Sequence, residues 1–146
     1  MTLTPLYQKK FLNIFTGMKN NMQYLLDTHV ILWWFTTPEK MNTKVQEIIR
    51  DKSNNIFLSS ASFWEMAIKK SLGRLTLPHN LIEAVAAESF KILPIMPEEG
   101  LGVADLPMLH SDPFDRLLII QAKLHDLIII TKDSKMAEYP VVIIEA

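Results

Sequence analysis

The chain has 146 residues, 49% of them hydrophobic and 21% charged, with no cysteine and a formal net charge of −1. This balance is typical of one ordinary globular domain with a substantial core, and no apolar run approaches the ~20 residues that cross a bilayer. The lack of cysteine excludes disulfide bonds, thiolate metal sites and cysteine nucleophiles and fits a reducing cytoplasm, while the near-zero charge argues against a surface built for nonspecific polyanion binding.

The N-terminal 21 residues precede the first strong strand. They carry lysines around an apolar stretch at residues 11–15, which is too short and too interrupted to be typical of a signal peptide. We therefore predict an appendage at residues 1–21 and a single domain over residues 22–146.

Strand and helix patterns alternate through the first half of this domain. Residues 24–26 form a short apolar strand, a helical stretch follows it and stops near Pro38, and another helix opens at Asn42. A second strand is predicted at residues 56–58. The clearest helix comes next and ends at Gly73, and its predicted buried stripe consists of Trp64, Ala67, Ile68, Ser71 and Leu72.

The alternation continues in the second half. A helix starting at residues 78–80 is predicted to turn Ile82, Val85 and Ala86 inward, and Pro94 indicates an edge position for a strand at residues 92–95. After a less regular segment with a short helix at residues 96–108, we predict a helix over residues 114–125, a strand at 127–130 buried on both faces, a short capped helix from 134, and a last strand at 141–144. This order favours an α/β fold with a mostly parallel sheet.

Acidic side chains stand where the strands of such a fold end. Ligands of open α/β sheets bind beyond the carboxyl ends of the strands. Asp27 ends the first strand, Glu65 lies in the first turns of the helix after the second strand, Asp112 and Asp115 begin the helix before the long apolar strand, and Asp133 follows that strand. We therefore expect these carboxylates to meet at one rim.

Each carboxylate also has a purely structural interpretation. Asp27, Asp112 and Asp133 are suited to cap the helices that follow them, and Asp115 suits the dipole of its helix. Asp112 has the spacing of an ion pair with Arg116.

Glu65 has two such interpretations of its own. It has the spacing of a capping box with Ser62 and of an ion pair with Lys69.

Clustering of the acids favours a functional interpretation over the structural ones, because carboxylates that converge raise each other's pKa values unless a cation holds them. Oxygen ligands without histidine or cysteine favour Mg²⁺ or Mn²⁺, which suit phosphodiester hydrolysis.

Five strings of the sequence resemble those of PIN-domain proteins, and within them the VapC-type toxins of bacterial toxin–antitoxin pairs. They occur in the expected order across residues 22–146. The strings are LLDTH at 25–29, SFWEMAIK at 62–69, GRLTLP at 73–78, DPFDR at 112–116 and TKD at 131–133.

This resemblance implies a three-layer α/β/α fold and a ribonuclease that uses Mg²⁺ or Mn²⁺. By the matching strings, Asp27, Glu65 and Asp115 take the places of the main acidic triad, and Asp133 is the fourth acid. The four would hold the metal. The resemblance also implies a cognate antitoxin as partner and a homodimer of the toxin.

Supporting roles follow from the same resemblance. Thr28 and Thr131 are expected to hold the neighbouring carboxylates or a metal-bound water, and Asp112 to orient Arg116 or support the metal shell. Arg116 or nearby lysines would hold the RNA strand. Ile120 stands where the related motif usually has alanine, so it either shifts the helix carrying Asp115 or faces a roomier part of the core.

Three functions are compatible with the sequence. The first is an endoribonuclease toxin that cuts RNA with the four acids; the second is a non-catalytic PIN-like module that binds a protein partner; the third is a metal phosphoesterase acting on DNA or small substrates. The aromatic residues Trp33, Trp34, Phe63 and Trp64 are assigned to the core or a dimer surface, with stacking on RNA bases as the alternative. The four histidines are scattered along the sequence, which disfavours a nuclease site based on histidine.

Overall fold

The computed structural model describes residues 22–146, so the predicted appendage at residues 1–21 lies outside the described part of the chain. Its centre is a parallel five-stranded sheet in the order β3-β2-β1-β4-β5. The third strand is at an edge, as Pro94 indicated. The strands are β1 (Gln23–Leu26), β2 (Asn55–Ser59), β3 (Lys91–Leu93), β4 (Ile128–Thr131) and β5 (Ile143–Glu145).

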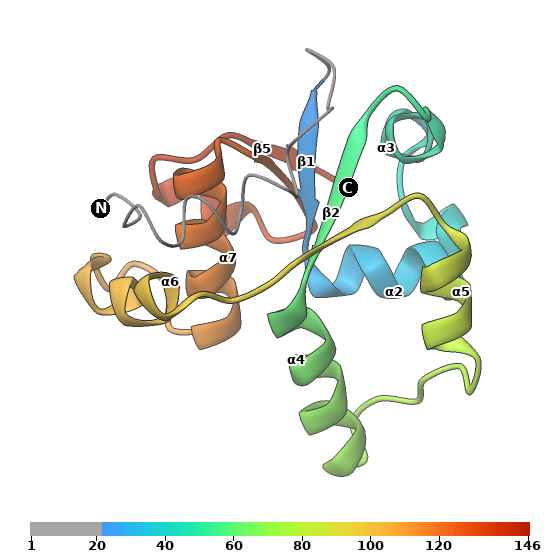
Figure 1. The fold of residues 1–146 in the computed structure, drawn as a ribbon, viewed down its shortest axis with the longest axis horizontal. Coiled ribbons are helices and arrows are strands. Elements are labelled where there is room, and N and C mark those ends of the chain that lie inside the picture. Colours follow the sequence, from blue (N-terminus) through green and yellow to red (C-terminus); the bar gives the residue numbers. More distant parts are fainter. Residues whose placement is uncertain (1–21) are drawn as a thin grey trace.

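Helices cover both faces of the sheet, which confirms the three-layer α/β/α fold. In Figure 1, α6 and α7 lie on one side of the sheet and α2, α3 and α5 on the other. The helices are α2 (Thr28–Thr36), α3 (Thr43–Arg50), α4 (Ser60–Ser71), α5 (Leu81–Ala87), α6 (Pro97–Gly102) and α7 (Pro113–His125), with short 3₁₀ turns η1 (Pro38–Lys40), η2 (Val103–Asp105) and η3 (Ser134–Glu138). No helix in residues 22–146 is long and apolar enough to span a bilayer.

Successive residues of the central strands supply two separate cores. Leu25 and Ile129 pack with α7, whereas Leu26 and Ile130 pack with the residues of α2 and α3 on the opposite face. This follows from the period of two in a strand, where neighbouring side chains point to opposite faces. Ile120 is buried in the α7 core, so the sheet on this side accommodates the larger side chain that the sequence placed there.

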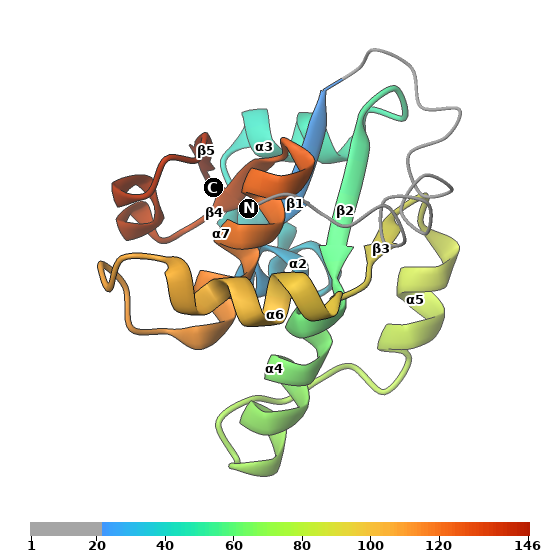
Figure 2. The same cartoon turned by 60° about the vertical axis from the view of Figure 1, so that its left-hand side comes forward.

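Helix α4 contradicts the predicted buried stripe. Trp64 and Leu72 are 62% and 58% exposed, while Glu65 and Met66 are buried. Figures 1 and 2 show the reason: α4 leaves the end of β2 and extends beyond the sheet, so only its first turns are covered. Apolar periodicity defined a stripe without showing whether a neighbour covers it. The predicted C-terminal glycine is confirmed, since Gly73 has φ of +72°, a conformation that costs glycine little.

Helix α5 confirms the predicted inward position of Val85 but not those of Ile82 and Ala86. It begins at Leu81, and its buried residues are Leu81 and Val85. Ile82 is 68% exposed and Ala86 is also exposed. Leu81 and Val85 have the same spacing of four residues as Ile82 and Ala86. The pair with the larger combined side chains, Leu81 and Val85, is the one that is buried.

Candidate active site

Asp27 lies where the central strand β1 passes into α2, and its carboxylate is almost completely buried. Oδ1 accepts a hydrogen bond of 3.1 Å from the amide of Val30, so Asp27 caps α2 as predicted. Oδ2 accepts a hydrogen bond from the Thr131 hydroxyl at the end of the neighbouring strand β4. Burial raises the pKa of Asp27, and the hydrogen bonds from Thr131 and Val30 offset this only in part.

Glu65 lies on the buried face of the first turns of α4. Its Oε1 accepts a 2.6 Å hydrogen bond from the Thr28 hydroxyl, and its Oε2 lies 2.5 Å from Nζ of Lys69. The predicted ion pair with Lys69 is therefore present, and both threonines hold a carboxylate. The predicted capping box is wrong, because Ser59 caps α4 and the buried Ser62 hydroxyl has no hydrogen-bond partner within residues 22–146.

The N-terminus of α7 brings in two more acids. Asp112 caps the helix, with Oδ1 accepting hydrogen bonds of 2.8 Å and 3.2 Å from the amides of Phe114 and Asp115. Burial, together with the negative charges of Asp112 and Asp27, raises the pKa of Asp115 to about 7. Asp115 is thus a carboxylate that resists ionisation in the absence of a cation.

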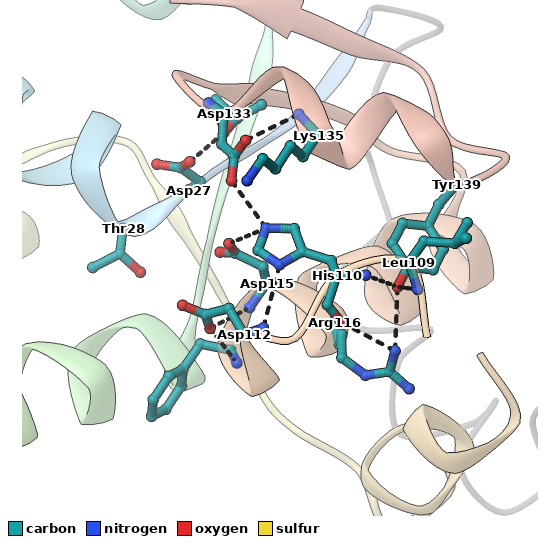
Figure 3. Close-up of polar contacts among 12 residues, drawn as sticks. Asp27, Thr28, Leu109, His110, Asp112, Asp115, Arg116, Asp133, Lys135 and Tyr139 are labelled. Atoms are coloured by element: carbon teal, nitrogen blue, oxygen red, sulfur yellow. Dashed lines mark hydrogen bonds and ion pairs between the residues drawn. The ribbon is translucent and has the colours of Figure 1, made fainter. Parts of the chain in front are cut away.

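Asp133 and His110 complete the cluster (Figure 3). Asp133 caps η3, with Oδ1 accepting from the amide of Lys135 at 2.9 Å. Its Oδ2 lies 2.9 Å from Nε2 of His110, which is also 3.1 Å from Oδ2 of Asp115. Partial desolvation opposes ionisation of Asp133, but the hydrogen bonds from Lys135 and His110 outweigh it and keep the pKa of Asp133 below its usual value.

His110 is the site residue that sequence reasoning missed. It lies on the irregular segment before α7, where no helical or strand pattern predicts the direction of a side chain. The available signal was its position two residues before Asp112.

Arg116 contradicts the prediction that it holds the RNA strand. The side chain is buried, with 5% of the residue exposed. Nη2 donates to the carbonyls of Val103 and Leu106 at 2.9 Å and 3.2 Å, and Nη1 donates to the carbonyl of Pro107 at 3.0 Å. A guanidinium with this many internal acceptors is unavailable to a phosphate.

The same guanidinium supports the segment that carries His110. Nη1 of Arg116 donates to the Tyr139 hydroxyl at 3.2 Å, and that hydroxyl accepts from the amides of Leu109 and His110 at 3.1 Å and 2.9 Å. Asp112 makes none of the ion pairs found within residues 22–146, so the predicted pair with Arg116 is absent.

One cavity of about 170 Å³ collects the predicted acids. Two lysines, Lys69 and Lys132, also line it. Thr131 lies behind Asp27 and is fully buried. The lining consists of Asp27, Thr28, His29, Glu65, Lys69, His110, Asp112, Asp115, Lys132 and Asp133.

The donor set of this cavity fits a divalent cation. Burial raises the pKa values of both Asp27 and Asp115, and neighbouring acids raise that of Asp115 further. A bound cation would remove that cost. The donors are hard carboxylate oxygens, which Mg²⁺ and Mn²⁺ prefer. Oxygen and nitrogen atoms of His110, Asp115 and Asp133 also lie within 4.8 Å of one another.

Comparison with known proteins gives one family. A family model described as the PIN domain matches residues 24–142. A protein named Ribonuclease VapC22 from Mycobacterium tuberculosis is 25% identical over 118 residues, which cover 79% of this chain and 90% of that protein.

Solved structures share the fold at low sequence identity. The chain is similar to one in VapBC2 from Rickettsia felis bound to a DNA fragment from their promoter, with a TM-score of 0.66, 14% identity, and coverage of 85% of this chain and 98% of that chain. It is also similar to a chain in DNA-bound VapBC from Salmonella typhimurium, with a TM-score of 0.58, 19% identity, and coverage of 85% and 98%. These likenesses agree with the layered fold described above.

Proposed function

The chain belongs to the PIN domain family, and on that premise we propose that it is a metal-dependent endoribonuclease acting as the toxin of a toxin–antitoxin pair. The observation that carries this proposal is the convergence of Asp27, Glu65 and Asp115, from three separate elements, on one cavity. Structural caps alone do not require three carboxylates to approach one another, since each could cap its helix without facing the others.

The proposed metal ligands are Asp27, Glu65 and Asp115, with Asp133 as the fourth acid beside them. A bound Mg²⁺ or Mn²⁺ would polarise the scissile phosphate and lower the pKa of a water molecule. The hydroxyls of Thr131 and Thr28 hold Asp27 and Glu65 in position through the hydrogen bonds described above.

The sequence offered Arg116 or nearby lysines as the groups that hold the RNA strand, and the burial of Arg116 favours the lysines. Lys69 and Lys132 line the cavity, and each ammonium group can attract a phosphate of the strand. Lys132 also lies 5.8 Å from the centre of the Trp33 ring, a contact that limits where its side chain can extend. We assign strand binding to these two lysines.

RNA and an antitoxin are the proposed partners. The curated relative is named a ribonuclease, and the matched structures include VapBC assemblies and a toxin–antitoxin complex from Klebsiella pneumoniae. We extend these properties to this chain, together with a homodimer of the toxin and a cytoplasmic location.

The test is thermal unfolding and RNA cleavage by the wild type and by Asp27→Asn, each with and without Mn²⁺. A ligand that binds only the folded state stabilises it by ~2.7 kcal/mol at a hundredfold excess over its dissociation constant. We expect Mn²⁺ to raise the unfolding temperature of the wild type but not of Asp27→Asn, and cleavage to be lost in the variant.

Asp51→Asn is the matched control, because Asp51 is fully exposed and bonds Ser53 away from the cavity. It should respond to Mn²⁺ and cleave RNA like the wild type. Cleavage by Asp27→Asn at the wild-type rate would contradict the metal assignment. Running DNA and a chromogenic phosphodiester in the same buffer distinguishes a ribonuclease from a broader phosphoesterase, and inertness toward all three favours the binding module.

A further inference from the structure

The side chain of His110 stands between two carboxylates of the cavity, and nothing in the proposed function gives it a task. Its Nε2 lies 2.9 Å from Oδ2 of Asp133 and 3.1 Å from Oδ2 of Asp115, as Figure 3 shows. Such an arrangement has two chemical interpretations. The ring nitrogen either donates its proton in the hydrogen bond to Asp133, with Asp115 beside it, or joins the two oxygens as a third ligand of a cation.

The other ring nitrogen decides between these interpretations. The amide of Asp112 donates to Nδ1 of His110 across 3.2 Å. An amide nitrogen is always a donor, so Nδ1 must be the acceptor and cannot carry a hydrogen. The proton of the neutral ring is therefore on Nε2, which faces only carboxylate oxygens.

A cation on Nε2 would require the opposite tautomer. Its lone pair would have to face the metal and the proton would have to move to Nδ1, where the Asp112 amide already points. The three groups are spaced closely enough to hold a metal ion, but the hydrogen bond to the ring opposes that use.

We propose that His110 is a positioning residue that directs its Nε2 proton at Asp133 and packs its ring edge against Asp115, and that it is not itself a metal ligand. This inference rests on the proposed metal site. The ring nitrogen lies 3.1 Å from Oδ2 of Asp115 and restricts where that oxygen can move, and no group within residues 22–146 donates to Oδ1, which stays available to the cation. Asp133 has a donor at each oxygen, Lys135 and His110, so its contribution is to anchor the ring.

The backbone of His110 is held as firmly as its ring. Its amide donates to the Tyr139 hydroxyl at 2.9 Å, and its carbonyl accepts from Nη1 of Arg116 at 3.4 Å. Both partners are buried. The buried arginine of the DPFDR string thus serves the metal site indirectly, by presenting His110 to the two acids.

Mn²⁺ binding by the full chain, measured by calorimetry, tests this role with three substitutions. His110→Gln keeps an N–H donor near the position of Nε2, His110→Ala removes it, and His79→Ala is the control on an exposed histidine outside the cavity. Loss of an outer partner of a metal ligand typically weakens metal binding by ~10–100-fold. We expect that loss in His110→Ala, recovery to within a few-fold of wild type in His110→Gln, and no change in His79→Ala.

Two spectroscopic measurements on the wild type test the proposal without any variant. Pulsed EPR of the Mn²⁺-loaded protein should show no directly bound nitrogen, and ¹⁵N NMR of the metal-free protein should show Nδ1 of His110 unprotonated and Nε2 protonated. A nitrogen bound to Mn²⁺, a protonated Nδ1, or His110→Gln binding as weakly as His110→Ala would overturn the positioning role. If the wild type bound no Mn²⁺, the proposed metal site would fail, while the NMR result would still decide the tautomer.

Discussion

Helix α7 has a histidine–carboxylate contact near each of its ends, and the two contacts differ in what surrounds them. At the C-terminal end, Nε2 of His125 lies 2.8 Å from Oε1 of Glu99. The other oxygen of Glu99 accepts from the amide of Met96 at 2.8 Å and faces Nε2 of Gln121 at 3.5 Å. This carboxylate is completely buried and has a partner at each oxygen, which is how a structural acid is accommodated in a core.

At the N-terminal end of α7, Asp115 has fewer hydrogen-bond donors than Glu99 has at the other end. Nε2 of His110 makes its hydrogen bond with Asp133 and only lies near Asp115, and the charges of Asp112 and Asp27 add to the burial of Asp115 in raising its pKa to about 7. Glu99 is even more buried than Asp115, so burial of an acid is not by itself a sign of function. What marks the cavity is an excess of acids over donors, a typical property of catalytic and metal sites.

The largest effect that separates the two ends should be on RNA cleavage. Asp115→Asn removes a proposed ligand, and metal stabilisation of the transition state amounts to several kcal/mol, so we expect ~10²–10³-fold slower cleavage. Glu99→Gln, at the structural end, should cleave within a few-fold of wild type. Initial rates on one RNA at saturating Mn²⁺ provide the comparison. Equal rates for Asp115→Asn and wild type would remove Asp115 from the metal site.

Arg116 provides the next largest effect, on stability. Arg116→Met removes the guanidinium from the carbonyls of Val103, Leu106 and Pro107. Val103 and Pro107 keep other donors, but Leu106 has none within residues 22–146, and an unsatisfied buried polar group costs ~1–3 kcal/mol, to which the other lost hydrogen bonds add. We expect the free energy of unfolding to fall by about 2–4 kcal/mol in urea titrations. Arg74→Met, at an exposed arginine, is the matched control and should change it by less than ~0.5 kcal/mol. An Arg116→Met protein as stable as the control would show that the loop does not depend on the guanidinium.

Much of this architecture could be predicted from local signals. Alternating strand and helix patterns predicted the layered fold, and capping residues such as Asp27, Asp112 and Asp133 marked the helix starts correctly. The convergence of acids on one cavity followed as well, because parallel strands end at the same edge of a sheet.

The errors share one physical cause, which is dependence on distant parts of the chain. Trp64 is exposed because α4 outreaches the sheet, and no property of the helix itself reports the extent of its neighbours. Arg116 and His110 were misjudged because their partners come from the irregular segment before α7 and from Tyr139 after β4. Such positions are decided by the fold and not by sequence spacing.

A smaller effect should appear in the pH dependence of stability without metal. The pKa of Asp115 rises from 3.8 in a model peptide to about 7 in the folded protein, so folding favours its protonated form. Below pH 3.8 the group is protonated in both states and costs nothing; as pH rises toward 7 the folded state loses stability, and above pH 7 the loss is complete. Urea midpoints at pH 5 and pH 8 should therefore show a steeper decline for wild type than for Asp115→Asn.

The comparison with Asp115→Asn also removes other contributions in that window. Burial lowers the pKa of His29, so its contribution rises with pH toward the unfolded value of 6.5 and opposes that of Asp115. It is common to both proteins and cancels in the difference. The lowered pKa of Asp133 acts only below its unfolded value of 3.8. Identical slopes for the two proteins would contradict the raised pKa of Asp115.

The smallest effect concerns Lys69, whose ammonium lies 2.5 Å from Oε2 of Glu65 with 35% of the side chain exposed. Water screens the partly exposed ammonium, and the buried Glu65 keeps its hydrogen bond from Thr28, so Lys69→Met should lower the free energy of unfolding by only about 1 kcal/mol. A cation at Glu65 must compete with this ammonium, so without RNA the variant should bind Mn²⁺ a few-fold more tightly, while its KM for RNA rises because a phosphate contact is lost. Lys70→Met, on the exposed side of the same helix, should change neither quantity. Weaker Mn²⁺ binding in Lys69→Met would instead mean that the lysine orients Glu65 for the metal, as His125 and the Met96 amide orient the buried Glu99.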